Sequence, residues 1–149
     1  MTDRTVPTGI AGMPAYQRKV VRETFESIRD QAGPVSLLFY GKLFELAPEA
    51  RRLFHNDLAA QGQKLMIMLE SIVSSLDNFD GMRERLRELG RQHAGYGVKP
   101  GDYETLMVAL SWTFAQALGP DYDAAAREAW RVILTEVSET MKSGTGREA

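Results

Sequence analysis

The chain has 149 residues, of which 44% are hydrophobic and 26% charged, values typical of one globular domain with a single sizeable core. The net charge of −2 gives no support for nucleic acid or an anionic membrane as a partner. Because there is no cysteine, disulfides, zinc–thiolate sites, iron–sulfur clusters and thiol catalysis are all excluded.

The two ends differ in character from the middle of the chain. Residues 1–14 are polar and rich in glycine and proline, so we expect a flexible lead-in, followed by one domain over residues 15–142 and a frayed tail over 143–149. There is no signal peptide and no run of roughly 18 apolar residues that could span a membrane. A cytoplasmic location is therefore the default expectation.

Between the ends, apolar side chains recur at helical spacing, and no segment alternates as a strand does. Gly33-Pro34, Pro48 and Gly119-Pro120 separate the periodic segments, because glycine and proline end helices. The pattern predicts an all-α fold of about seven helices, over residues 16–28, 35–46, 48–54 (a short turn), 58–76, 82–93, 103–118 and 126–141. Helices of such unequal length are expected to pack crosswise and to leave room for a pocket, unlike those of an up-and-down bundle.

His93 stands out because the chain has only two histidines. It continues the helical apolar stripe of Met82, Leu86 and Leu89, which places it on a core-facing side. A buried imidazole needs a partner for its acceptor nitrogen, and iron is one such partner. On position alone, a core histidine bonded to a carbonyl competes with a metal ligand.

Several stretches together resemble the globin family, over roughly Tyr16 to Met141. The similarity is to bacterial single-domain globins and to the haem domain of flavohaemoglobins. It is carried by Leu38-Phe39-Tyr40-Gly41-Lys42-Leu43-Phe44 with Pro48-Glu49 and Leu53-Phe54, by Gln61-Gly62-Gln63-Lys64-Leu65, and by His93-Ala94-Gly95-Tyr96-Gly97-Val98 with Tyr103. The resemblance implies a globin fold packed around a haem pocket, haem b (iron protoporphyrin IX) as cofactor, and dioxygen, carbon monoxide and nitric oxide as ligands.

On the proximal side, the resemblance implies that His93 is the iron ligand. The carbonyl of Leu89, one turn earlier, is the natural acceptor for its second ring nitrogen. Val98 and Tyr103 resemble contacts along the haem edge, and Phe54 resembles the phenylalanine that stacks on the haem. For Phe54, Val98 and Tyr103, ordinary core packing is the competing explanation.

On the distal side, Tyr40 and Gln61 resemble the pair of residues that donate hydrogen bonds to a bound gas, and they are the candidate catalytic residues. Gln63 competes with Gln61 if the helix register slips by two. Leu65 shares the face of Gln61 and would press on the ligand. Lys64 resembles a rim cation that pairs with a haem propionate, although a solvated lysine explains it equally well.

The chain also departs from these relatives. Flavohaemoglobins continue into a reductase, and no such segment follows here, so an external reductase would be needed. Leu134 stands where flavohaemoglobins carry a tyrosine behind the proximal histidine, and Glu136 and Glu139 are out of register for the matching glutamate. Neuroglobin-like proteins place a distal histidine on iron, whereas this chain has Gln61. With only His55 left, an open or water-bound sixth position is expected.

Three functions share this one predicted site. The first is reversible binding of dioxygen at ferrous iron, for storage or transport. The second is a nitric oxide dioxygenase that depends on the external reductase, and the third is a haem-based redox or gas sensor. A haem-free helical module is the alternative if His93 binds no iron. The sequence does not fix the oligomeric state.

Overall fold

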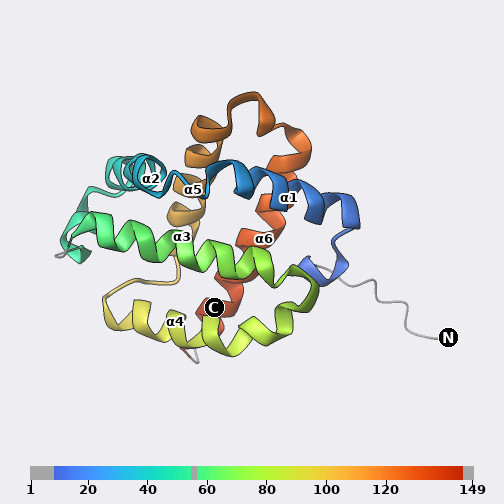
Figure 1. Ribbon diagram of the computed structural model, residues 1–149. Coiled ribbons are helices and arrows are strands. Elements are labelled where there is room, and N and C mark those ends of the chain that lie inside the picture. Colours follow the sequence, from blue (N-terminus) through green and yellow to red (C-terminus); the bar gives the residue numbers. More distant parts are fainter. Residues whose placement is uncertain (1–8, 55–56, 146–149) are drawn as a thin grey trace.

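The computed structural model describes residues 9–54 and 57–145 as an assembly of helices (Figure 1). Within these residues there are six α-helices, four 3₁₀-helices and no strand, which confirms the predicted all-α class. The elements are η1 (Gly9–Gly12), α1 (Ala15–Ile28), α2 (Ala32–Leu46), η2 (Pro48–Leu53), α3 (Leu58–Ser74), η3 (Leu76–Met82), α4 (Arg83–Gly95), α5 (Asp102–Leu118), η4 (Gly119–Asp121) and α6 (Ala124–Ser143).

Local sequence explains where the longer helices begin and end. The side chain of Asp57 accepts a hydrogen bond from the Ala59 N–H, 2.9 Å away, at the start of α3. Asp123 accepts one from the Ala126 N–H, also 2.9 Å away, at the start of α6. Both bonds satisfy N–H groups that have no partner within the helix. Gly119 ends α5 with a φ of +59°, a conformation that favours glycine.

The core is built around α6, which packs against α1, α4 and α5. Trp130 of α6 is fully buried, and its ring lies 4.6 Å from that of Phe114 in α5. The indole N–H donates to Thr24 Oγ1 of α1 over 2.9 Å, so its one polar group is satisfied inside the core. This cluster fixes α1, α5 and α6 relative to one another.

The remaining helices leave a less tightly packed region on one side of this core. Helix α2 packs on α3 and α5, and α4 packs on α6. In Figure 1, α3 and α4 run across the same side of the molecule. Among the described residues, however, their backbones make no extensive contact with each other, nor does either with α5. A site for a ligand is therefore to be sought between α3, α4 and α5.

Two glycines allow the close helix crossings that position this region. Gly62 of α3 faces Ser36 of α2, and a Cβ at Gly62 would overlap that serine side chain. Gly90 of α4 lies against the backbone carbonyl of Met141 in α6, which a Cβ at Gly90 would overlap. The second contact is the more restrictive one, because a backbone carbonyl cannot rotate away as a side chain can. It sets how closely the segment that carries His93 approaches the core.

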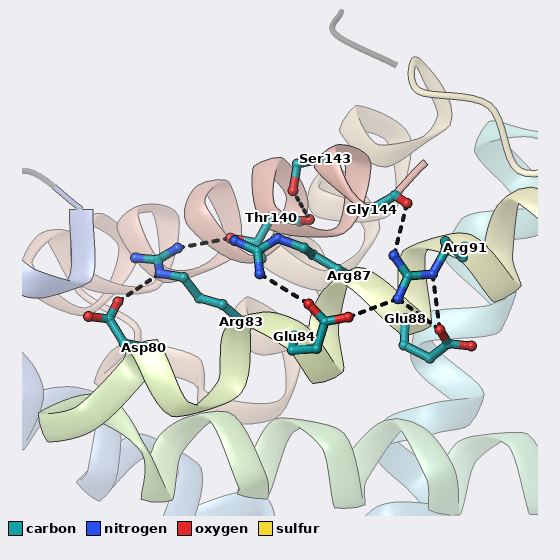
Figure 2. A network of polar contacts seen from close by, with 9 residues as sticks. All are labelled: Asp80, Arg83, Glu84, Arg87, Glu88, Arg91, Thr140, Ser143 and Gly144. Carbon is teal, nitrogen blue, oxygen red and sulfur yellow. Dashed lines mark hydrogen bonds and ion pairs between the residues drawn. The ribbon is translucent and has the colours of Figure 1, made fainter. Parts of the chain in front are cut away.

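Ion pairs line the outer side of α4 (Figure 2). Glu84 lies 3.3 Å from Arg87 and 3.0 Å from Arg91, and Arg91 also donates to the carbonyl of Gly144 over 3.2 Å. These side chains are exposed to solvent, which screens the charges, so each pair adds little to stability. The backbone contact at Gly90 is closer and less exposed than these surface pairs.

The N-terminal boundary differs from the sequence-based expectation. Residues 9–14 were expected to belong to a flexible lead-in, but Gly9–Gly12 forms a 3₁₀-helix in which Ile10 is fully buried. Met13 is buried as well. Gly9–Gly12 and Met13 therefore belong to the packed part of the described chain, because a buried isoleucine outweighs the polar, glycine-rich composition around it. At the other end, α6 closes at Ser143, one residue beyond the expected boundary.

Within the ranges that the structure describes, no helix is long and apolar enough to cross a membrane. The same ranges contain no group of three or more histidine, cysteine or acidic side chains arranged to hold a metal ion.

The crossing at Gly90 makes a prediction about stability. We expect Gly90→Ala to lower the free energy of unfolding by about 1 to 3 kcal/mol, because the added methyl forces α4 away from Met141. Gly41→Ala is the matched control: Gly41 is also helical but nothing lies within 4 Å of its Cβ position, so alanine should stabilise by up to about 1 kcal/mol. Urea unfolding measures the free energy of unfolding of both variants. If the two substitutions changed it equally, the close contact between Gly90 and Met141 would be contradicted.

Candidate functional site

His93 lies in the last turn of α4 and is half-buried. Its Nδ1 lies 2.8 Å from the carbonyl oxygen of Leu89, one turn earlier in the helix. Since a carbonyl can only accept, Nδ1 carries the proton and donates it. The lone pair is then on Nε2, which has no hydrogen-bond partner among the described residues.

Burial lowers the pKa of His93 below its ordinary value, partly offset by the hydrogen bond to Leu89. Desolvation penalises the charged imidazolium, so the neutral ring is favoured. A neutral imidazole with a protonated Nδ1 and a free Nε2 is the form in which histidine binds a metal. The hydrogen bond predicted from the one-turn spacing of Leu89 and His93 is thus present.

The turn between α4 and α5 contacts the same histidine. The Val98 N–H donates to the carbonyl of His93 over 3.0 Å. Tyr103, in the first turn of α5, is buried, and its ring lies 6.5 Å from the imidazole with 25° between the planes. Val98 and Tyr103 are therefore neighbours of His93, as the sequence suggested, although both also pack into the core.

A separate aromatic cluster joins α2 to the segment after η2. The ring of Tyr40 lies 5.2 Å from that of Phe54 and 6.0 Å from that of Phe44, and Phe44 lies 5.7 Å from Phe54. Phe54 is only half-buried, so part of its ring is available to another group. The structure thus brings together Tyr40 and Phe54, two residues identified separately in the sequence.

The hydroxyl of Tyr40 is well suited to donate a hydrogen bond to a ligand. Tyr40 is 5% exposed, and burial raises its pKa to about 12, so the phenol stays protonated at any physiological pH. No described residue accepts a hydrogen bond from this hydroxyl. The hydroxyl is not sealed from solvent, because Arg18 Nε is the one fully buried polar side-chain atom without a partner among the described residues. The Tyr40 hydroxyl is therefore available to donate to a polar ligand beside it.

Helix α3 presents a half-buried face that includes Gln61 and, four residues on, Leu65. Leu65 packs against both the main core and the cluster of Tyr40, so it lies between the two. Gln63 is exposed, which supports Gln61 as the glutamine that faces inward. Lys64 is exposed too and has no ion pair among the described residues.

The side chains that face the region between α3, α4 and α5 share one property: they are apolar but only half-buried. They come from α3, α4 and α5, the helices whose backbones do not pack closely on one another. They are Leu65, Met68, Leu89, Leu106, Met107 and Leu110. A hollow of about 540 Å³ between α3 and α4 reaches Met68 and Leu89, with charged residues of α4 at its rim.

Four of these lining residues were not identified as site residues from the sequence. Met68, Leu106, Met107 and Leu110 belong to ordinary helical stripes, and spacing does not separate a stripe that packs on protein from one that packs on a cofactor. Their incomplete burial is the distinguishing signal, and only the structure provides it. His55, the other histidine, lies outside the described residues.

No acidic side chain in the described part of the chain contacts His93. Glu136 accepts hydrogen bonds from the Ile10 N–H and from Arg83, and Glu139 pairs with Lys142. Leu134 is buried in the core. Among the described residues, the hydrogen-bond partner of the His93 ring is the carbonyl of Leu89.

Taken together, the site offers a neutral imidazole nitrogen, a protonated phenol and an apolar lining from three helices. Such a set fits a largely apolar cofactor that carries a metal for the free imidazole nitrogen to bind.

Comparison with known proteins agrees with this reading. The family model described as Globin matches residues 37–141, more than half of the chain. A neuroglobin of Tetraodon nigroviridis is 28% identical over 89% of this chain and 92% of its own length. A neuroglobin of Danio rerio is 25% identical over 84% and 87%.

Solved structures with the same fold come from other sources. A proposed nitric oxide dioxygenase of Rhodothermus marinus, in a form engineered as a carbene transferase, superposes with a TM-score of 0.79 at 24% identity over 90% of this chain and 94% of its own. A bacterial globin of Campylobacter jejuni gives 0.77 at 18% identity over 89% and 96%. The fold is thus shared with bacterial globins, as expected, and the curated relatives add neuroglobins. Globins bind haem and, through it, gases, and this chain belongs to the globin family.

Proposed function

We propose that this globin binds haem b with His93 as the iron ligand and that its function is the reversible binding of dioxygen. The observation that supports this most is the hydrogen bond of 2.8 Å from Nδ1 of His93 to the carbonyl of Leu89, which leaves the Nε2 lone pair free. That nitrogen belongs to a half-buried ring bordered by the half-buried apolar residues of α3, α4 and α5.

The chain's residues would hold the cofactor mainly by apolar contact. The proposed contacts are Phe54, Leu65, Leu89, Val98 and Tyr103, and the ring of Phe54 is partly exposed and so available to stack on the cofactor. Lys64 is proposed to pair with a propionate, a contribution of only about 0 to 1 kcal/mol because the lysine is exposed. When bound, haem supplies an iron atom that takes up dioxygen, carbon monoxide or nitric oxide.

Tyr40 and Gln61 are proposed to hold the gas. The raised pKa of Tyr40 keeps its hydroxyl protonated, so it can donate to an oxygen that gains negative charge. Gln61 can donate as well, and it can also accept from Tyr40 and orient it. Two donors in an apolar pocket predict slow release of dioxygen, which suits chemistry on the gas more than delivery.

The alternative proposal follows from that slow release: a nitric oxide dioxygenase. The overall reaction joins one nitric oxide, one dioxygen and one electron into nitrate, and the electron must come from a separate reductase. Nitrate formed in repeated turnovers only when a reductase is added would support this function. A single turnover at most under the same conditions would leave gas binding, or sensing by the same site, as the function.

The first prediction concerns His93. We expect His93→Ala to bind haem at least about 100-fold more weakly. Removing only a residue that hydrogen-bonds to a metal ligand typically lowers metal affinity about 10- to 100-fold, so removing the ligand itself should cost at least as much. The measurement is the Soret band of purified protein after haem is added in equal amount and free haem is removed. His55→Ala is the matched control and should keep the band. Equal haem retention in both variants would refute ligation by His93.

The second prediction concerns the two distal donors. We expect Tyr40→Phe and Gln61→Leu each to speed dioxygen release by about tenfold, the factor for one lost hydrogen bond. Stopped-flow displacement of dioxygen by carbon monoxide measures the rate. Gln63→Leu is the control, since Gln63 is exposed, and it should leave the rate unchanged. If Gln63→Leu changed the rate and Gln61→Leu did not, Gln63 rather than Gln61 would be the glutamine of α3 that contacts the gas.

A further inference from the structure

We propose that Glu136 is a positioning residue for the proximal helix: together with the N-terminal turn η1 it clamps the start of α4 onto α6 and so fixes where His93 stands. We refer to Ile10, Arg83 and Glu136 as the clamp. The inference rests on the proposed function in one respect, namely that His93 binds the cofactor. It assigns a role to a carboxylate that the site itself does not use.

Both oxygens of Glu136 are engaged, each by a different segment of the chain. Oε1 accepts from the Ile10 N–H over 2.6 Å, and Oε2 accepts from Arg83 Nη2 over 2.6 Å. The Glu136 side chain is 18% exposed, whereas that of Asp80, the other partner of Arg83, is 87% exposed. Charge-assisted hydrogen bonds this short and this sheltered contribute more than exposed ion pairs do.

The N-terminal turn is shaped around this carboxylate. Gly9 has a φ of +66°, and a Cβ there would overlap the carboxylate of Glu136. Ile10, the next residue, is fully buried and anchors the turn in the core. Residues more than 120 positions apart in sequence are thereby joined at one side chain.

On the other side, Arg83 is the first residue of α4. Its guanidinium also donates to Asp80 and to Thr140 of α6 (Figure 2). It lies over the ring of Phe79 as well, 5.0 Å from the ring centroid. Arg83 therefore connects the beginning of α4 to α6 at two points, Glu136 and Thr140. Of these, Glu136 is the charged one.

The clamp can influence His93 because of how α4 is supported. Helix α4 packs extensively on α6 but not on α3 or α5, so its far face borders the cofactor region. Gly90 contacts Met141 near the other end of the helix, and His93 lies ten residues beyond Arg83, about 15 Å along the axis. A helix held at one end and near the other is fixed in tilt. Releasing Arg83 allows α4 to pivot about Gly90 and displaces His93.

The test begins with Glu136→Gln in the haem-loaded protein. The amide oxygen can still accept from Ile10, but the charge opposite Arg83 is lost. We expect haem transfer from the ferric protein to a haem-accepting trap protein to become about three- to tenfold faster. The iron–histidine stretching band in the resonance Raman spectrum of the reduced protein should shift or broaden. Glu139→Gln is the control, because Glu139 is exposed and pairs only with Lys142.

A second variant perturbs the clamp from the N-terminal side without touching α4. Gly9→Ala should accelerate haem transfer and change the Raman band in the same direction as Glu136→Gln. Gly33→Ala is its control, since nothing lies within 4 Å of the added methyl. The proposal would be overturned if both the Raman band and the transfer rate were unchanged in Glu136→Gln and in Gly9→Ala.

A general loss of stability is separated from positioning by a third variant. Thr24→Val removes the acceptor of the Trp130 indole N–H and weakens the fold away from α4. Under the proposal, amide hydrogen exchange rises selectively in α4 for Glu136→Gln, and more uniformly for Thr24→Val. If hydrogen exchange rose uniformly in both variants, Glu136 would be merely structural and the proposal would fail. Hydrogen exchange can be measured with or without haem. If the wild-type chain took up no haem, that result would refute the proposed function but not the role of Glu136 in holding α4.

Discussion

The hydrogen bond from Nδ1 of His93 to the carbonyl of Leu89 is the constraint on which the account of this globin depends. It fixes the tautomer, because a carbonyl cannot donate, and it leaves one ring nitrogen with a free lone pair. Burial supports the same state by disfavouring the charged imidazolium. The bond exists because His93 and Leu89 are one turn apart on the same helical face, so the helix geometry determines which ring nitrogen is left free, as the proposed iron ligation requires.

The rest of the fold serves to hold that ring at an open site. Helix α6 packs on α5 through the contact of Trp130 with Phe114. The crossing at Gly90 brings α4 close to α6. The helices opposite α4 stay apart, so apolar side chains that would otherwise be buried remain half-exposed. Such surface is unfavourable in water, and burying it against an apolar cofactor would be favourable in proportion to its area. Tyr40 adds an unpaired donor at the edge of the same region.

Sequence spacing predicted the six α-helices of the described chain and the Leu89–His93 pairing, since both follow from a period of 3.6 residues. Gln61 was identified by the resemblance to globins, and only its partial burial, against the exposure of Gln63, separates it from that competitor. Sequence spacing did not reveal η1, because one buried isoleucine in a glycine-rich segment has no periodicity. The role of Glu136 was also hidden: its partners, Ile10 and Arg83, are 126 and 53 residues away, and only the fold brings them together. The sequence showed the apolar stripe of α5 that contains the lining residues. It could not show that these side chains are incompletely covered by other parts of the protein.

The most direct test of the central claim is the absorption spectrum of the dithionite-reduced protein without oxygen, before and after carbon monoxide is added. With Nε2 of His93 as the one protein ligand and Gln61 in place of a distal histidine, we predict a five-coordinate ferrous spectrum that shifts sharply with carbon monoxide. A six-coordinate ferrous spectrum would contradict the open distal side, and the absence of any Soret band after haem is added would contradict ligation by His93 itself.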